Sequence, residues 1–149
     1  MPVNPELVGR AFPPTAPYLV GREKVREFAR AVFADAPQHV DPEAARALGY
    51  ADVVAPPTFA IVMQDITLQQ MLAYPESGIE LSRIVHAEQR FRYSRPIVAG
   101  DELVATLSVA GVRAMRGNAM VTMEAEVVDA DGAHVVTTTS ILLVGDSDA

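Results

Sequence analysis

Between residues 84 and 144, apolar and polar side chains alternate at every second position over long stretches. This period is typical of strands with one face on a core. It predicts four strands, over residues 84–93, 102–113, 119–129 and 133–144. The stretches between them are short and rich in Gly, Asn and Asp, which favour tight turns. The pattern therefore predicts an antiparallel sheet, to which residues 18–20 can add a further strand.

The first half of the chain has the longer period of helices. After Gly21, apolar residues recur with helical spacing at Val25, Phe28, Ala29, Val32 and Phe33. These five residues predict the buried stripe of a surface helix.

A short helix is predicted over residues 42–48 from its terminal residues. Asp41 can cap its N-terminus, Pro42 suits the first helical position, and Gly49 suits the residue after its end.

A third helix is predicted over residues 58–73, with Thr58 as its cap after Pro56 and Pro57. Its first turns are apolar on every side, whereas its later turns have a polar face. We therefore expect a central helix that is enclosed by the sheet.

These elements predict an α+β protein with a single domain over residues 1–149. A sheet of about five antiparallel strands curled around one central helix is a hotdog fold. Such a sheet leaves edge strands unpaired, and dimerisation can cover them. We therefore expect a dimer.

Composition narrows the possible functions. The net charge of −7 and the pI near 4.8 disfavour nucleic acid as a partner. The chain has no Cys and only three His, so we expect no metal site. It contains no nucleotide-binding motif and no serine-hydrolase motif, so we expect neither a cofactor nor serine-hydrolase chemistry. No uncharged run is long enough to span a membrane and the first residues do not resemble a signal peptide, so we expect a cytoplasmic protein without a membrane partner.

The segment between the first two predicted helices has the densest set of candidate polar residues. His39 is either a general acid or base, since histidine titrates near neutral pH, or a loop side chain bonded to the backbone. Asp35 can likewise cap a turn, as Asp41 caps the short helix. Spacing alone favours the structural interpretation of His39.

Two segments resemble known proteins. Residues 37–45, Gly49 and residues 54–59 resemble the hydratase region of MaoC-like (R)-specific enoyl-thioester hydratases. Residues 86–101, together with residues 8–10 and 22–29, resemble actinobacterial single-hotdog proteins. Those proteins are similar to the non-catalytic subunit of the (3R)-hydroxyacyl-ACP dehydratase of mycolic acid synthesis, which pairs with a catalytic hotdog subunit. The resemblance covers nearly the whole chain.

This resemblance implies an acyl-thioester site, but an incomplete one. Catalytic members have a motif of the form Asp-x-Asn-Pro-x-His-x-Asp, in which the first Asp and the His handle the water that adds to the β-carbon. Here the position of that Asp is Ala34, and His39 alone remains in register. Asp35, one residue later, can substitute only if the loop shifts.

The oxyanion donor of the catalytic members is also altered. Their Ala-His-Gly is replaced here by residues 55–57, and Pro57 has no N–H to donate. The N–H of Thr58 is the alternative donor. The resemblance further implies an acyl-chain channel, whose candidate lining residues are Phe59, Val62, Met63 and Ile66. Core packing is the other interpretation of these four residues.

The predicted function is therefore an acyl-binding subunit of a (3R)-hydroxyacyl-thioester dehydratase or enoyl hydratase. Its substrate is an acyl group carried by CoA or by acyl carrier protein. A catalytic hotdog partner supplies the residues that this chain lacks. One alternative is a homodimeric (R)-specific enoyl-CoA hydratase that uses His39 with Asp35. Another is a hotdog acyl-CoA thioesterase that uses Asp65.

Overall fold

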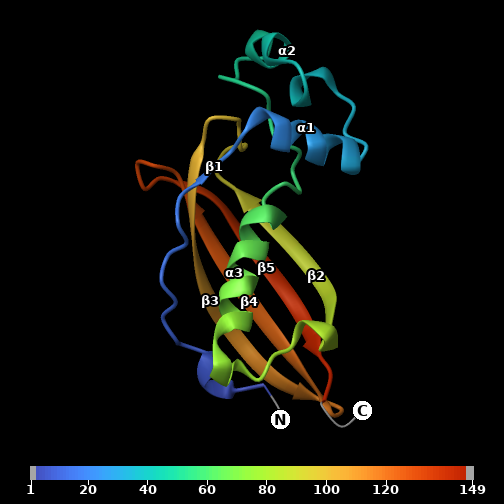
Figure 1. Cartoon of the computed structure of the whole chain (residues 1–149), viewed down its shortest axis with the longest axis vertical. Coiled ribbons are helices and arrows are strands. Elements are labelled where there is room, and N and C mark those ends of the chain that lie inside the picture. Colours follow the sequence, from blue (N-terminus) through green and yellow to red (C-terminus); the bar gives the residue numbers. More distant parts are fainter. Residues whose placement is uncertain (1–2, 147–149) are drawn as a thin grey trace.

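The computed structural model describes residues 3–146, so the first two and last three residues of the predicted domain lie outside it. The strands form one antiparallel sheet in the order β1-β3-β4-β5-β2. They are β1 (Tyr18–Leu19), β2 (Ile84–Tyr93), β3 (Glu102–Met115), β4 (Asn118–Val128) and β5 (His134–Val144). The sheet curls around helix α3 (Ile61–Ala73), which lies across its concave face (Figure 1). This is the predicted hotdog fold.

The other helices lie beyond one end of the sheet (Figure 1). They are α1 (Arg22–Ala31), the 3-10 turn η2 (Pro37–His39) and α2 (Pro42–Ala47). Three further 3-10 turns lie near the C-terminal end of α3, at the other end of the sheet. They are η1 (Pro5–Leu7), η3 (Pro75–Ser77) and η4 (Leu81–Arg83). The segment predicted to carry chemistry is therefore placed over one end of the sheet.

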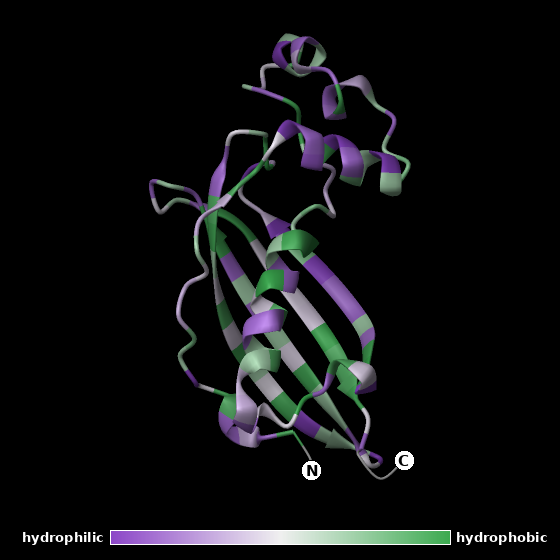
Figure 2. Cartoon of the chain, viewed as in Figure 1, coloured by the Kyte–Doolittle hydropathy of each residue, from purple (hydrophilic) through white to green (hydrophobic). Residues whose placement is uncertain are grey.

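The alternation in sequence matches the two faces of the strands. On β4, four apolar residues at alternate positions are all buried: Val121, Met123, Ala125 and Val127. The same alternation of apolar and polar positions is visible along the other strands (Figure 2). The four long strands begin and end within two residues of their predicted bounds.

The predicted start of α2 is confirmed. The Asp41 carboxylate accepts a hydrogen bond of 3.0 Å from the N–H of Glu43, and Pro42 is the first helical residue. Gly49 follows the helix with a φ of 94°, a conformation that favours glycine.

The predicted start of α3 is wrong by one turn. The helix begins at Ile61 with Ala60 as its N-cap, and Thr58 makes no side-chain capping bond. Instead, the carbonyl of Thr58 accepts from the N–H of Ile61, and the N–H of Phe59 donates to Pro56. Two consecutive prolines hold this stretch in turns because neither can donate a backbone hydrogen bond.

The predicted burial of Phe33 is also wrong, since 90% of this residue is exposed. The first helix ends at Ala31, and Phe33 takes a left-handed φ of 58°. The N–H of Ala34 then donates to Ala29, and that of Phe33 to Arg30, the pattern of a Schellman cap. The turn directs the ring away from the core.

The core consists of two hydrophobic clusters. The upper cluster, on the side of α1 and α2, has among its buried members Val25, Phe59, Met63, Leu103, Val127 and Val136. The lower cluster, toward the other end of α3, includes Leu7, Met71, Leu107, Met123, Leu142 and Val144. Thr138 and Ser140 on β5, and Gln64 and Thr67 on α3, are buried between these sets.

Replacing Thr138 with valine is expected to stabilise the fold. Its hydroxyl is fully buried and has no hydrogen-bond partner within residues 3–146. Leaving a buried polar group unpaired costs about 1–3 kcal/mol. Thr138→Val keeps the shape of the side chain and should raise the free energy of unfolding by about that amount, measured by urea denaturation.

The matched control is Thr139→Val, at the next residue of β5, which is only partly buried. It should change the free energy of unfolding by less than about 0.5 kcal/mol. A loss of stability in Thr138→Val would show that the hydroxyl is paired, for example through a buried water.

Candidate functional site

A pocket of about 390 Å³ lies where η2 meets the end of β2. Its lining includes His39, Pro57, Tyr93, Arg95 and two members of the upper cluster, Ala55 and Ile97. A short antiparallel ladder builds this region. The N–H of Ala55 donates to Ile97, and the N–H of Ala99 donates to Val53. The pocket thus joins the η2 loop to the hydrophobic core.

His39 is held in this pocket by the backbone of Val54. The Nδ1 atom of His39 lies 2.6 Å from the Val54 carbonyl, and the N–H of Val54 donates to Gln38. Because a carbonyl only accepts, Nδ1 must carry the proton, and Nε2 then has the free lone pair in neutral histidine. Such a ring can accept a proton from a water or hydroxyl group placed in the pocket.

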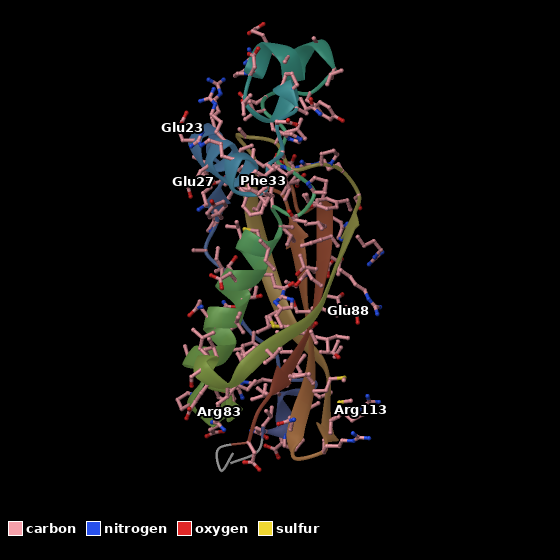
Figure 3. All side chains as sticks on the ribbon, turned by 90° about the vertical axis from the view of Figure 1, so that its right-hand side faces the viewer. Glu23, Glu27, Phe33, Arg83, Glu88 and Arg113 are labelled. Atoms are coloured by element: carbon pink, nitrogen blue, oxygen red, sulfur yellow. The ribbon has the colours of Figure 1, made fainter. Side chains whose placement is uncertain are left out.

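Asp35 does not join His39 in this pocket. Asp35 is exposed and lines a separate hollow of about 300 Å³ with Phe33, Ala34 and Val40. Phe33, which lines the same hollow as Asp35, lies just after the end of α1 (Figure 3). The two residues predicted as a pair therefore line different pockets of the described chain.

Thr58 is exposed beside Pro57, at the start of the turns that precede α3. Pro57 lines the pocket and has no N–H to donate there. Its carbonyl is bonded within the protein. That carbonyl accepts a hydrogen bond of 2.5 Å from the Tyr93 hydroxyl. This hydrogen bond fixes the segment to β2.

Of the four candidate channel residues, Phe59 and Met63 are fully buried in the upper cluster, and Val62 and Ile66 pack against it partly buried. Phe59 also contacts Phe28 edge to face, with ring centroids 5.4 Å apart. All four therefore belong to the core below the pocket. Their role in holding an acyl chain remains a prediction.

Tyr93 and Arg95 are site residues that the sequence reasoning did not single out. Both lie within the segment 86–101 that resembles the single-hotdog proteins, which was the available signal. Arg95 forms ion pairs with Asp101 and Asp129, at 2.8 and 3.3 Å. Burial raises the pKa of the Tyr93 hydroxyl from its ordinary value of 10 to about 12.

The raised pKa of Tyr93 predicts an alkaline transition. A group whose pKa is raised on folding stabilises the fold fully below its ordinary pKa and loses that contribution as the pH rises from 10 to about 12. A tyrosinate absorbance titration of the folded protein should show a step near pH 12 that Tyr93→Phe lacks. Loss of the hydrogen bond to Pro57 should also lower the free energy of unfolding by about 1 kcal/mol.

Tyr50→Phe, at an exposed tyrosine, serves as the control and should retain the step. A wild-type titration that is complete well below this range would contradict the burial of the Tyr93 hydroxyl.

Within residues 3–146, no three His, Asp or Glu side chains are grouped closely enough to hold a metal ion. Among these same residues, no helix has the length and apolar character that crossing a membrane requires.

The curled sheet around α3, with a histidine-bearing loop over its end, defines a hotdog protein of the MaoC-like dehydratase type. A family model described as "FAS1-like, dehydratase domain region" matches residues 6–138, and the chain belongs to this family. Over its full length the chain is 64% identical to a UPF0336 protein of Clavibacter michiganensis subsp. michiganensis, and the match covers 100% of both. The resemblance predicted from the sequence is thereby confirmed.

Two solved structures agree with this family assignment. One is of a HadBC (3R-hydroxyacyl-ACP dehydratase) complex from Mycobacterium tuberculosis, with a TM-score of 0.80 and 33% identity. The match covers 89% of this chain and 92% of that one. The other is a MaoC-like dehydratase with a TM-score of 0.86 and 37% identity, and it covers 95% of this chain but 43% of that longer one.

Proposed function

We propose that this chain is the acyl-binding subunit of a (3R)-hydroxyacyl-thioester dehydratase or enoyl-thioester hydratase in the cytosol. A second hotdog subunit supplies the Asp–His pair. The observation that supports the proposal is that His39 and Asp35 line different pockets. His39 lines one pocket together with Pro57, and Asp35 lines another.

The chemistry explains why this division matters. In hydration, a base takes a proton from water as its oxygen bonds to the β-carbon, and an acid delivers a proton to the α-carbon. Dehydration reverses these steps. The negative charge that develops on the thioester oxygen needs an N–H donor. Pro57 cannot donate an N–H to the thioester oxygen. Without a carboxylate beside it, His39 would have to serve as both the acid and the base.

The edge of the sheet supports a partner subunit. In the described chain, β2 pairs with β5 on one side, and its other edge has no strand beside it. An exposed edge of this length favours pairing with another sheet. The related HadBC structure is itself a complex.

The test is hydration of crotonyl-CoA and of a longer enoyl-CoA by the purified chain, with its native mass measured in the same preparation. We expect no turnover by the chain alone, and turnover after mixing with a hotdog subunit that carries the full Asp–His motif. His39→Ala in this chain should leave the rate of the mixture within about twofold, since a base that is not used contributes nothing.

A second candidate, a self-sufficient homodimeric hydratase, is favoured by the geometry of His39, whose Nε2 can act as a base. Turnover by the chain alone that falls by about 10²–10⁴-fold in His39→Ala would establish it and overturn the first proposal. His86→Ala is the matched control, because His86 is exposed on β2, does not line the pocket, and its Nε2 lies 3.1 Å from the carbonyl of Glu88.

The thioesterase alternative has weaker support. Asp65, its candidate carboxylate, is exposed on α3. Release of free thiol from acyl-CoA by the chain alone would favour it over both hydratase candidates.

A further inference from the structure

A band of polar side chains crosses the core between the two hydrophobic clusters. The members of this polar band are Gln64 and Thr67 on α3, Gln89 on β2, and Thr138 and Ser140 on β5. Gln89 is partly buried and the other four are buried. The apolar residues of the core therefore do not form one continuous region beneath α3.

Hydrogen bonds through Gln89 of β2 join three members of the polar band. The Nε2 amide of Gln89 donates to Oε1 of Gln64 at 2.7 Å, and the Ser140 hydroxyl donates to Oε1 of Gln89 at 2.5 Å. These two bonds connect α3 to β2 and β2 to β5. The Thr67 hydroxyl donates to the carbonyl of Gln64 at 2.7 Å and so keeps its polar atom within the helix.

The band lies directly below the candidate site along β2. Starting from the pocket, the side chains of β2 that face α3 are Tyr93, Phe91 and Gln89. Tyr93 lines the pocket, and Phe91 packs on the upper cluster. Gln89 follows four residues from Tyr93, which is about 14 Å along an extended strand.

An apolar chain cannot pass the band without a cost. It would have to separate Gln64 from Gln89 and leave buried amide groups without partners, and methylene groups offer no replacement. Above the band, in contrast, the side chains of β2 that face α3 are the aromatic rings of Phe91 and Tyr93, which pack against the apolar upper cluster.

We propose that the polar band is the end of the acyl-binding site and sets the longest chain that this subunit accepts. Gln64 and Gln89 are its specificity-determining residues. The substrate class is then an acyl thioester whose chain ends within the upper cluster. This inference rests on the proposed function, because it assumes that the chain binds an acyl thioester through the described pocket.

The test measures binding of saturated acyl-pantetheine thioesters to the purified protein by titration calorimetry. The series comprises butanoyl, octanoyl, dodecanoyl and hexadecanoyl chains. For the wild type, affinity should rise with each longer chain that fits above the band, because more apolar surface is buried. It should then level off or fall by the hexadecanoyl compound.

The variant Gln64→Leu/Gln89→Leu/Ser140→Ala removes both bonds and all of their partners together. Replacing a buried polar network by apolar groups of similar size is often neutral or stabilising, so this variant should fold. Thermal unfolding and circular dichroism check that it does. It should bind the hexadecanoyl thioester at least about tenfold more tightly than the wild type does, with the butanoyl affinity unchanged within about twofold.

Gln69→Leu is the matched control, since Gln69 lies on the exposed side of α3, and it should keep the wild-type profile. A wild-type affinity that rises without a break through the hexadecanoyl compound would overturn the inference. So would a triple variant that folds and keeps the wild-type profile. Absence of binding for every chain length, in the wild type and the variant, would instead overturn the proposed function.

Discussion

Replacing Phe59 with alanine is expected to lower the free energy of unfolding by about 3–5 kcal/mol, the usual cost of removing a buried aromatic ring. Phe59 has 0% exposure and packs edge to face on Phe28, so it connects the turns before α3 to α1. Its removal leaves a cavity where the upper cluster meets these two elements. Urea unfolding followed by circular dichroism measures the loss.

Phe33→Ala is the matched control for this substitution. The Phe33 ring is 90% exposed, so its truncation should cost less than about 0.5 kcal/mol. Equal losses for the two variants would mean that the ring of Phe33 is buried in solution, for example against another subunit. A small loss for Phe59→Ala would mean that the upper cluster can close over the vacated space.

The second large effect is expected from Arg95→Met. Arg95 pairs with two carboxylates, those of Asp101 and Asp129, whose side chains are mostly buried. The backbone N–H of Ala133 and the Arg95 guanidinium also hold the pKa of Asp129 below its ordinary value. Removing the cation leaves two neighbouring carboxylates without their shared partner.

We expect this substitution to lower the free energy of unfolding by about 2 kcal/mol, less than for a fully buried pair because solvent reaches part of the Arg95 side chain. The loss should shrink at low pH, where the carboxylates are protonated. Arg92→Met is the control, since Arg92 makes a long hydrogen bond to Thr137 and forms no ion pair with any residue from 3 to 146. Similar losses for Arg95→Met and Arg92→Met would show that the ion pairs contribute little.

Local patterns predicted most of the fold. The alternation along residues 119–129 identified β4 and its buried face, and Asp41 and Pro42 identified the start of α2. These features depend on a few neighbouring residues and on the period of one element, so a single sequence contains the information. The hotdog arrangement followed from the order of the elements.

The failures are of a different kind. The periodicity that placed Phe33 in the core continues past the true end of α1, because the left-handed residue that ends the helix is a phenylalanine instead of the usual glycine. Thr58 is a good cap by residue type, but Pro56, Pro57 and the hydrogen bond from Tyr93 to Pro57 hold its segment in turns.

The sequence by itself determined the strands, the capped short helix, the family and the presence of His39 without the usual carboxylate. Only the tertiary structure decided that Asp35 and His39 line different pockets, that Tyr93 and Arg95 border the pocket of His39, and that Gln64, Gln89 and Ser140 are joined by hydrogen bonds. The physical reason is distance along the chain. Gln64, Gln89 and Ser140 belong to three different elements, and both Gln64 and Ser140 bond to Gln89. These bonds depend on how α3 packs on the sheet, so they leave no periodic signal in any of the three segments.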